Sequence, residues 1–283
     1  MDNNDLAIII PHLGQEALYR VLSSLTLQSD KRFAIYGFCL RSEPEIKALF
    51  EDYAEQTDLI ICEVDAYPGA DEPLADRVSF FLRPLGGERF VTFSDGEAIY
   101  GRDCVRAFHE RILRSDTADL FRWEKKRFGC ARLPFGRYFQ RYILGGKDLP
   151  LSQVIARRTT LERCFSENEY FSPRQVVAEL AAADGLVRIP VAVVHPEDRT
   201  PDTEARVQDA ADRCSVIEWA EERFERTWPV GRWRSLNRTA DLFTNLVPWV
   251  SKEEARKRFM ALKMSEKAPG LARTAFVLNS WGL

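Results

Sequence analysis

Two carboxylates stand one residue apart in the segment GGERFVTFSDGEAIYGRDCV, where the apolar run Phe90–Phe93 leads directly into Ser94-Asp95-Gly96-Glu97. Carboxylate oxygens are the ligands that Mg²⁺ and Mn²⁺ prefer, and such a metal can neutralise the charge of a diphosphate. A glycine between the two carboxylates lets another group approach the backbone closely. The segment therefore indicates either a metal-diphosphate site at Asp95 and Glu97 or a polar turn at the end of a strand.

Three further polar residues stand at the ends of apolar runs. His195 ends the run LVRIPVAVVHP and is a third candidate metal ligand, although a surface histidine before a proline turn fits the same pattern. Glu63 lies in the run LIICEV and Asp65 directly follows it. Either carboxylate could accept hydrogen bonds from a base or a ribose. A solvated strand end is the competing interpretation for both.

The composition indicates a globular chain without a transmembrane helix. Of the 283 residues, 45% are hydrophobic and 29% are charged, and no uninterrupted apolar run reaches the length that a membrane span needs. The residues Met1–Asp5 are polar and acidic, unlike a secretory signal. The six cysteines form no C-x-x-C pair, which favours reduced thiols over a disulfide framework or a zinc site. We therefore expect a cytoplasmic protein.

Strand-like and helix-like segments alternate through the first 125 residues. Continuous apolar runs predict strands buried on both faces, and apolar stripes at helical spacing predict the helices between them. The expected strands are Leu6–Ile10, Arg32–Phe38, Leu59–Val64 and Arg89–Phe93, with helices over Glu16–Gln28, from Pro44, and over Ala75–Leu85. This order predicts an α/β fold with a mostly parallel sheet flanked by helices, and such sheets bind ligands at the carboxyl ends of their strands.

Later segments extend this domain over residues 1–198. Strands are expected over Ala118–Trp123 and ending at Ala156, and Pro173 and Gly185 mark the beginning and end of a helix. Residues 199–283 are predicted to form a mainly helical C-terminal extension. From Trp219 onward it carries 12 Lys/Arg against 7 Asp/Glu. Its amphipathic helices would either pack on the protein or lie on an anionic membrane.

The segment RWEKKRFGCARLPFGRYFQRY interleaves basic and aromatic residues. This pattern occurs in proteins that bind single-stranded nucleic acid, but no nucleic-acid-binding module accompanies it here, so we expect no nucleic-acid partner. Aromatic faces and arginines also suit stacking on sugars and pairing with anionic groups. The alternative is a loop without a binding role, whose aromatic residues pack into the core.

The segment DLAIIIPHLGQEALYRVLSSLTLQSDKRFAIYGF resembles the beginning of family 2 glycosyltransferases, with a strand ending in Pro11, a Ser-Leu pair and Gln28. LADRVSFFLRPLGGERFVTFSDGE resembles the family's arginine, helix, Gly-Glu, strand and D-x-D motif, with Arg77 as the arginine. VIARRTTLERCFSE and AELAAADGLVRIPVAVVHP resemble its Arg-Arg pair and its closing helix, strand and histidine. The resemblance covers roughly residues 5–198 and implies the Rossmann-like GT-A fold of nucleotide-diphosphosugar transferases.

The resemblance also implies a ligand set. A nucleotide-diphosphosugar donor, UDP- or GDP-linked, would contact Pro11, Glu63, Asp65, Arg77, Asp95 and Gly96. A divalent metal, Mg²⁺ or Mn²⁺, would be held by Asp95, Glu97 and His195. The acceptor would be a glycan or a lipid-linked glycan, as in the synthesis of bacterial surface polysaccharide.

The sequence departs from the family pattern in three places. GFCLRSEP lacks the acidic pair that usually follows the second strand, and Glu43 comes later. ENEYFSPRQVV has Ser172-Pro173 where the family places the Glu-Asp that supplies the general base, which leaves Glu169 as the nearest candidate base. The metal motif is D-x-E rather than D-x-D.

We therefore expect a hexosyltransferase-type glycosyltransferase, cytoplasmic or peripheral at the inner face of the membrane through its C-terminal extension. The missing Glu-Asp pair favours an alternative, a catalytically inactive sugar-nucleotide- or glycan-binding protein on the same fold. A nucleotidyltransferase would need a Gly-rich loop with Arg or Lys after the first strand, and PHLGQEAL supplies only Gly14.

Overall fold

The computed structural model describes residues 5–40, 42–66, 74–96, 98–114, 117–124, 132–138, 141–142, 149, 151–167, 173–191, 193–194, 216 and 219. The chain divides into two compact units. The first comprises residues 1–135 and 149–197, and the second comprises residues 136–148 and 198–283. Every candidate site residue belongs to the first unit, so the fold of that unit decides how the site is built.

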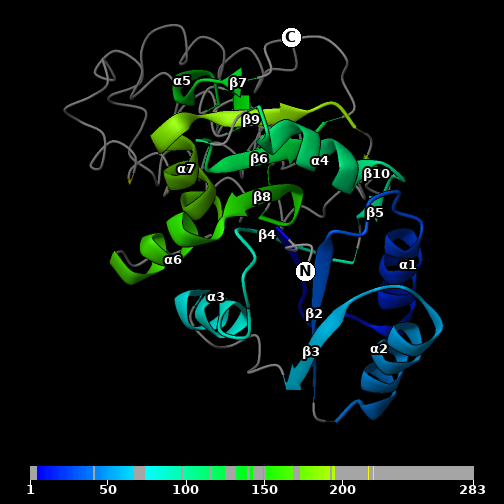
Figure 1. Ribbon diagram of the computed structural model, residues 1–283. Helices are drawn as coiled ribbons and strands as arrows, with labels where there is room; N and C mark the ends of the chain where they lie inside the picture. Colours follow the sequence, from blue (N-terminus) through cyan, green and yellow to red (C-terminus); the bar gives the residue numbers. More distant parts are fainter. Residues whose placement is uncertain are drawn as a thin grey trace, which may run out of the picture. The chain divides into compact units, whose positions relative to one another are not determined.

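An eight-stranded sheet forms the centre of the first unit, in the order β3-β2-β1-β4-β8-β6-β9-β7 (Figure 1). Its strands are β1 (Leu6–Ile10), β2 (Phe33–Cys39), β3 (Ile61–Ala66), β4 (Phe90–Phe93), β6 (Leu120–Trp123), β7 (Arg132–Leu133), β8 (Val154–Arg157) and β9 (Leu186–Ile189). The first four strands are parallel, and β6 is parallel to β9. Strand β8 is antiparallel to β4 and β6, and β7 is antiparallel to β9. The expected mostly parallel sheet is confirmed.

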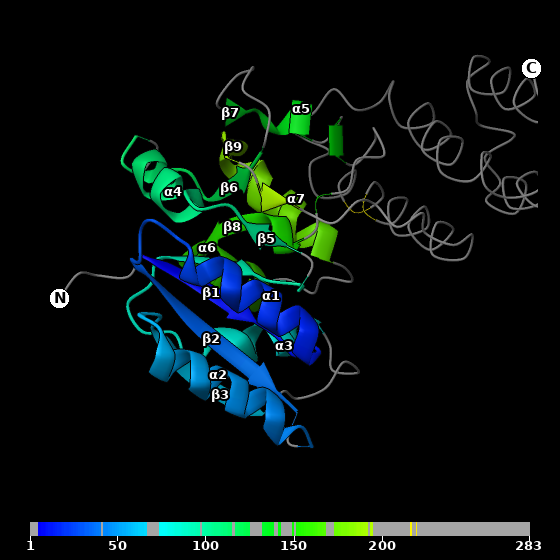
Figure 2. The same ribbon diagram turned by 90° about the vertical axis from the view of Figure 1, so that its right-hand side faces the viewer.

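Helices cover both faces of the sheet, as predicted (Figures 1 and 2). One face carries α1 (Gln15–Thr26), α2 (Pro44–Gln56) and α4 (Cys104–Ile112), whereas the other carries α3 (Leu74–Leu82), α6 (Arg158–Glu167) and α7 (Pro173–Asp184). The described residues also include a short helix, α5 (Phe135–Tyr138), and a 3₁₀ turn over Leu151–Gln153. No described helix is long and apolar enough to cross a membrane.

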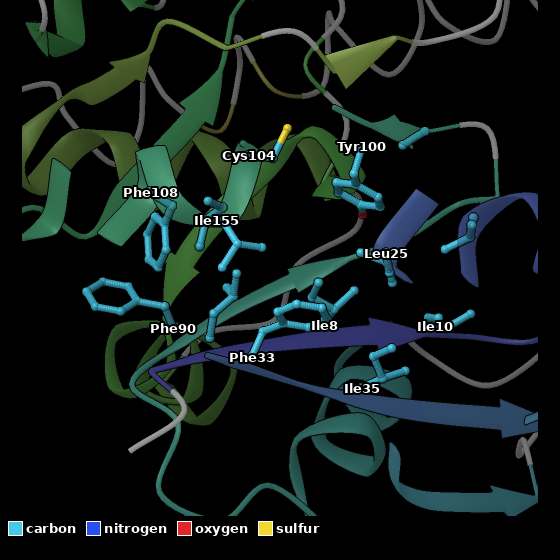
Figure 3. Packing of buried hydrophobic residues seen from close by; sticks show 14 of the residues in the cluster. Ile8, Ile10, Leu25, Phe33, Ile35, Phe90, Tyr100, Cys104, Phe108 and Ile155 are labelled. Carbon is cyan, nitrogen blue, oxygen red and sulfur yellow. The ribbon is translucent and has the colours of Figure 1, made fainter. Parts of the chain in front are cut away.

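The two layers of core explain the continuous apolar runs of the sequence. On the face covered by α1 and α2, side chains of alternate residues pack together, including Ile8, Ile10 and Phe33 (Figure 3). On the opposite face, the ring centroids of Phe38 and of Phe81 in α3 lie 4.7 Å apart. Because the inner strands are buried on both sides, they lack the apolar-polar alternation of a strand with one wet face.

Some strands differ from the expectation. Strand β3 begins and ends two residues later than the predicted segment 59–64, and the expected final strand is divided at Pro190 into β9 and β10 (Val193–Val194). Proline has no N–H to donate to a ladder, which explains this interruption. The two-residue strands β5 (Ile99–Tyr100) and β7 were not predicted, because two residues give no detectable periodicity.

A buried ion pair connects the α1–β2 loop to α4. Oδ2 of Asp30 lies 2.9 Å from Nδ1 of His109 and 2.6 Å from Nη2 of Arg32. Burial by itself would raise the pKa of Asp30, but the hydrogen bonds with Arg32 and His109 outweigh it and hold the pKa well below its usual value. The ionised carboxylate therefore stabilises the folded state.

Asp30→Asn should destabilise the protein at neutral pH by about 1–3 kcal/mol and weaken the dependence of stability on acid. Because the folded-state pKa is lowered, the stabilisation is complete above the unfolded-state value of about 4 and is lost as the pH falls below it. Urea unfolding between pH 7 and pH 3 measures this slope. Asp58→Asn is the control, since Asp58 pairs with Lys31 at an exposed position. If the free energy of unfolding falls equally between pH 7 and pH 3 in wild type and in Asp30→Asn, the stabilising role given to Asp30 is wrong.

Candidate functional site

The carboxyl ends of β1 to β4 lie at one edge of the sheet because these four strands are parallel. Pro11 and His12 follow β1 there, and Asp95 follows β4 after one residue. The ladder between β1 and β4 continues past the strand end, since the N–H of Ser94 donates to the carbonyl of Ile9 over 2.8 Å. This bond holds the SDG segment beside the β1–α1 loop.

The Asp95–Gly96 turn is tightly packed although its carboxylate is exposed. The backbone N–H of Ala98 donates to Oδ1 of Asp95 over 3.3 Å, which closes the turn. Gly96 has φ of +78°, and a Cβ added to it would lie 3.0 Å from side-chain atoms of Leu13 and Ala17. Only glycine fits both the backbone conformation and the space. Asp95 thus forms the turn and also offers an accessible carboxylate at a strand end.

Tyr100 lies beneath this turn. Its side chain is almost fully buried, and its ring stacks edge-on against Trp123 with centroids 5.6 Å apart. Figure 3 shows its hydroxyl pointing toward the carboxyl end of β4. Burial raises the pKa of Tyr100, the neighbouring hydroxyl of Ser94 opposes this increase, and the nearby carboxylate of Asp95 adds to it. The phenol therefore stays protonated and can act as a hydrogen-bond donor.

Two buried polar residues, Ser24 in α1 and Gln28 just after its end, fix the backbone around Tyr100. The N–H of Tyr100 donates to Oγ of Ser24 over 3.3 Å. Gln28 donates from Nε2 to the carbonyl of Gly101 over 2.9 Å, and its Oε1 accepts the N–H of Val105 over 3.2 Å. Ser24 and Gln28, which carried part of the family resemblance, therefore join α1 to the segment that follows the candidate metal motif.

An ion pair at the same edge was not predicted. Nδ1 of His12, in the β1–α1 loop, lies 3.2 Å from Oε2 of Glu43, directly before α2. Both side chains are about one-third exposed. Glu43 thus lies in the loop that follows the carboxyl end of β2, where the acidic pair of the family is missing. The only signal in the sequence was the carboxylate of Glu43 itself, because nothing local indicated its contact with His12.

Three other predicted donor-binding residues lie on elements that reach this edge. Glu63 and Asp65 lie in β3, which pairs with β2 through Glu63 with Tyr36 and Asp65 with Phe38. Arg77 is half-buried in the first turns of α3, which follow the carboxyl end of β3. Its Nε is buried without a hydrogen-bond partner among the described residues. An arginine so placed is suited to an anionic ligand.

The predicted residues Glu97, Glu169 and His195 lie outside the described residues. The strands around two of them nevertheless converge, because β10 is antiparallel to β5, with Val194 opposite Ile99 and Val193 opposite Tyr100. Val194 directly precedes His195, and Ile99 comes two residues after Glu97. Within the described part of the chain, no three His, Cys, Asp or Glu side chains gather into a metal site. The exposed carboxylate of Asp95 suits a hard divalent cation.

A second polar group lies at the carboxyl ends of β6 and β9. Glu124 directly follows β6, and its Oε2 lies 3.5 Å from Nη1 of Arg188 in β9. Beside it, Nη2 of Arg122 donates to Oε1 of Gln153 over 2.8 Å. Sequence patterns did not indicate this group, since its members come from three separate segments. The edge of the sheet is therefore polar on both sides of β4.

The Arg-Arg pair of the family resemblance lies at the opposite edge. Strand β8 is antiparallel to β4, so its last residue, Arg157, lies beside the beginning of β4. Nε of Arg157 lies 2.9 Å from Oδ1 of Asp119. Nη1 of Arg158 donates to the carbonyls of Leu85 and Gly86 over 3.1 and 2.9 Å. These contacts join chain segments, so the pair stabilises the fold and lies away from the candidate site.

Several solved structures of glycosyltransferases have a similar fold. Residues 1–349 of TarS from S. aureus match with a TM-score of 0.58 at 13% identity, over 99% of this chain and 92% of that one. The mannosyltransferase PcManGT from Pyrobaculum calidifontis, in complex with GDP-Man and Mn²⁺, matches with a TM-score of 0.59 at 14% identity, over 98% and 84%. TarS in complex with UDP-GlcNAc matches with a TM-score of 0.53 at 11% identity, over 98% and 89%.

These likenesses establish the fold, and the chain has the GT-A fold of nucleotide-sugar glycosyltransferases. No family model and no curated protein matches the sequence. The expected fold class is therefore confirmed by solved structures that share little sequence with the chain.

Gly96→Ala should destabilise the protein by about 1–3 kcal/mol, because alanine would have to adopt a positive φ and push against Leu13 and Ala17. Urea or thermal unfolding measures the change. Gly87→Ala is the matched control, since a Cβ there meets no atom within 4 Å. A Gly96→Ala protein as stable as Gly87→Ala would show that the turn is not constrained as described.

Proposed function

We propose that the chain is a glycosyltransferase that moves a sugar from a nucleotide-diphosphosugar donor to a glycan or lipid-linked glycan. The observation that carries the proposal is the convergence of the β1–α1 loop, Glu43 and the Asp95–Gly96 turn at the carboxyl edge of a GT-A sheet. Solved proteins with this fold are complexed with UDP-GlcNAc or with GDP-Man and Mn²⁺. A UDP- or GDP-linked donor is therefore the first class to test.

Each part of the donor would meet a different group of residues. His12 and Glu43, with Pro11 and the carboxylates of β3, Glu63 and Asp65, would surround the nucleoside. Arg77 would pair with the diphosphate, and Gly96 would let it approach the backbone. Asp95, Glu97 and His195 would hold Mg²⁺ or Mn²⁺, which would neutralise the charge that develops on the leaving diphosphate.

The acceptor would bind on the side of β6 and β9. Glu124 and Arg188 offer one acceptor and several donors for sugar hydroxyls at this end of the sheet. In an inverting reaction, the acceptor oxygen attacks the anomeric carbon opposite the departing diphosphate, while a general base removes the acceptor's proton. Glu169 is the proposed base, because it precedes α7 where the family usually carries its Glu-Asp pair.

The surroundings of the reaction are part of the same proposal. A role in bacterial surface polysaccharide synthesis would place the chain in the cytoplasm, with the basic C-terminal extension as a peripheral contact to the inner face of the membrane. The alternative function is a sugar-nucleotide- or glycan-binding protein without turnover. Ser172-Pro173, in place of the Glu-Asp pair, is the specific observation that favours this alternative.

Calorimetric titration with UDP and with GDP, each with and without Mn²⁺, tests the donor site. Wild type should bind one of the two more tightly when Mn²⁺ is present, and Asp95→Ala should abolish this metal-dependent gain because it removes a metal ligand. Asp52→Ala is the control, since it removes the same charge from an exposed position on α2. No binding of either nucleotide under both conditions would count against the proposed donor site.

Hydrolysis of the matching nucleotide-sugar separates the enzyme from the binding protein. If the chain is an enzyme, the wild type should release free sugar slowly without an acceptor. Glu169→Gln should retain donor binding and lower transfer to an acceptor about 100-fold or more, since general-base catalysis typically contributes 10²–10⁴. Donor binding with no release and no transfer to any glycan would favour the alternative function.

A further inference from the structure

Two buried hydroxyls lie beneath the Asp95–Gly96 turn. Ser94 is 0% exposed and Tyr100 is 3% exposed. Within the described part of the chain, neither Oγ of Ser94 nor Oη of Tyr100 makes an aligned hydrogen bond. A buried hydroxyl without a partner destabilises the fold, so a pair of them at one point requires an explanation.

Both hydroxyls are held by rigid parts of the fold. Ser94 continues the ladder of β4 by donating its N–H to the carbonyl of Ile9. Tyr100 is fixed at its backbone by Ser24 and at its ring by Trp123, whose Nε1 donates to the carbonyl of Cys104 over 3.1 Å. Because the rings and backbones cannot move freely, the hydroxyls keep their position under the turn.

The strongest nearby acceptor for these hydroxyls is the carboxylate of Asp95. It directly follows Ser94 in the chain, and the hydroxyl of Tyr100 points toward this end of β4 (Figure 3). A carboxylate is a charged acceptor, and hydrogen bonds to charged groups are stronger than those between neutral groups. Asp95 itself is exposed, so its carboxylate is accessible to a ligand.

We propose that Tyr100 and Ser94 are positioning residues for the candidate metal site. When a divalent cation binds Asp95, Oη of Tyr100 donates to Oγ of Ser94 and Oγ of Ser94 donates to the carboxylate, and this relay holds the carboxylate in one orientation. The inference rests on the proposed function, because it requires a metal-diphosphate at Asp95. It assigns these two hydroxyls a role beyond packing, since hydrogen bonds to a ligating carboxylate tune its affinity for the metal.

The test compares Tyr100→Phe and Ser94→Ala with wild type in the nucleotide titrations, with and without Mn²⁺. Each variant removes one hydroxyl of the relay and leaves Asp95 in place. We expect metal-dependent nucleotide binding to weaken about 10- to 100-fold in each, the usual loss for residues that support a metal ligand. Binding without metal should change less than about twofold. The double variant should lose less than the product of the two single losses, because the relay acts as one unit.

Tyr36→Phe is the matched control. Tyr36 is also 3% exposed, and its hydroxyl donates to Oε1 of Glu88 over 2.8 Å, away from the Asp95 turn. Tyr36→Phe therefore removes a buried phenol hydroxyl that is not part of the relay, and metal-dependent nucleotide binding should not change. Circular dichroism establishes that each variant folds, and Ser94→Ala keeps the test decisive if Tyr100→Phe does not.

The outcomes separate this inference from the proposed function. If wild type binds nucleotide in a Mn²⁺-dependent way and folded Tyr100→Phe or Ser94→Ala binds equally well, the relay is overturned and the proposed function stands. An equal loss with and without Mn²⁺ would also overturn it, since it would indicate a general distortion of the site. If wild type binds neither nucleotide with or without Mn²⁺, both fall together, whereas binding that does not depend on Mn²⁺ overturns the relay alone.

Discussion

The amide of Gln28 is buried in an apolar layer, and this constraint determines much of the site. A buried amide must find partners for both its donor and its acceptor, and Gln28 finds them in the backbone of Gly101 and Val105. Together with Ser24, it fixes the chain just beyond the Asp95–Gly96 turn. The position of the turn, the burial of Tyr100 and the path into α4 all follow from these hydrogen bonds. In the sequence, Gln28 was noticeable only as part of a family resemblance, and the structure supplies its physical role.

Much of the fold followed from local patterns. Segments such as Leu6–Ile10 and Phe90–Phe93 are so continuously apolar that only strands buried on both faces explain them, and Pro44 marks the beginning of α2 clearly. Predictions weakened where local patterns do not determine the structure. The pairing of β5 with β10 depends on a partner far away in the sequence, and the antiparallel direction of β8 depends on how the chain returns to the sheet.

The same distinction applies to the candidate site. Asp95 and Gly96 could be found because a strand, a glycine and acidic residues follow one another in the chain. His12 and Glu43 could not, because each is ordinary in its own loop and their contact arises only when β1 lies beside β2. Tyr100 resembled any aromatic residue of the core. Its relation to Asp95 depends on the ring's direction, which α1 and Trp123 determine from distant parts of the sequence.

The pairing of β5 with β10 also has a consequence for the order in which the chain is built. Strands β1 to β4 and helices α1 to α3 precede the Asp95 turn, so a nascent chain can complete that half of the sheet early in translation. Val193 and Val194 leave the ribosome much later and only then pair with Tyr100 and Ile99. Until that moment β5 is an unpaired strand, which can pair with another chain. Completion of the site is therefore coupled to the synthesis of the last strand of the first unit.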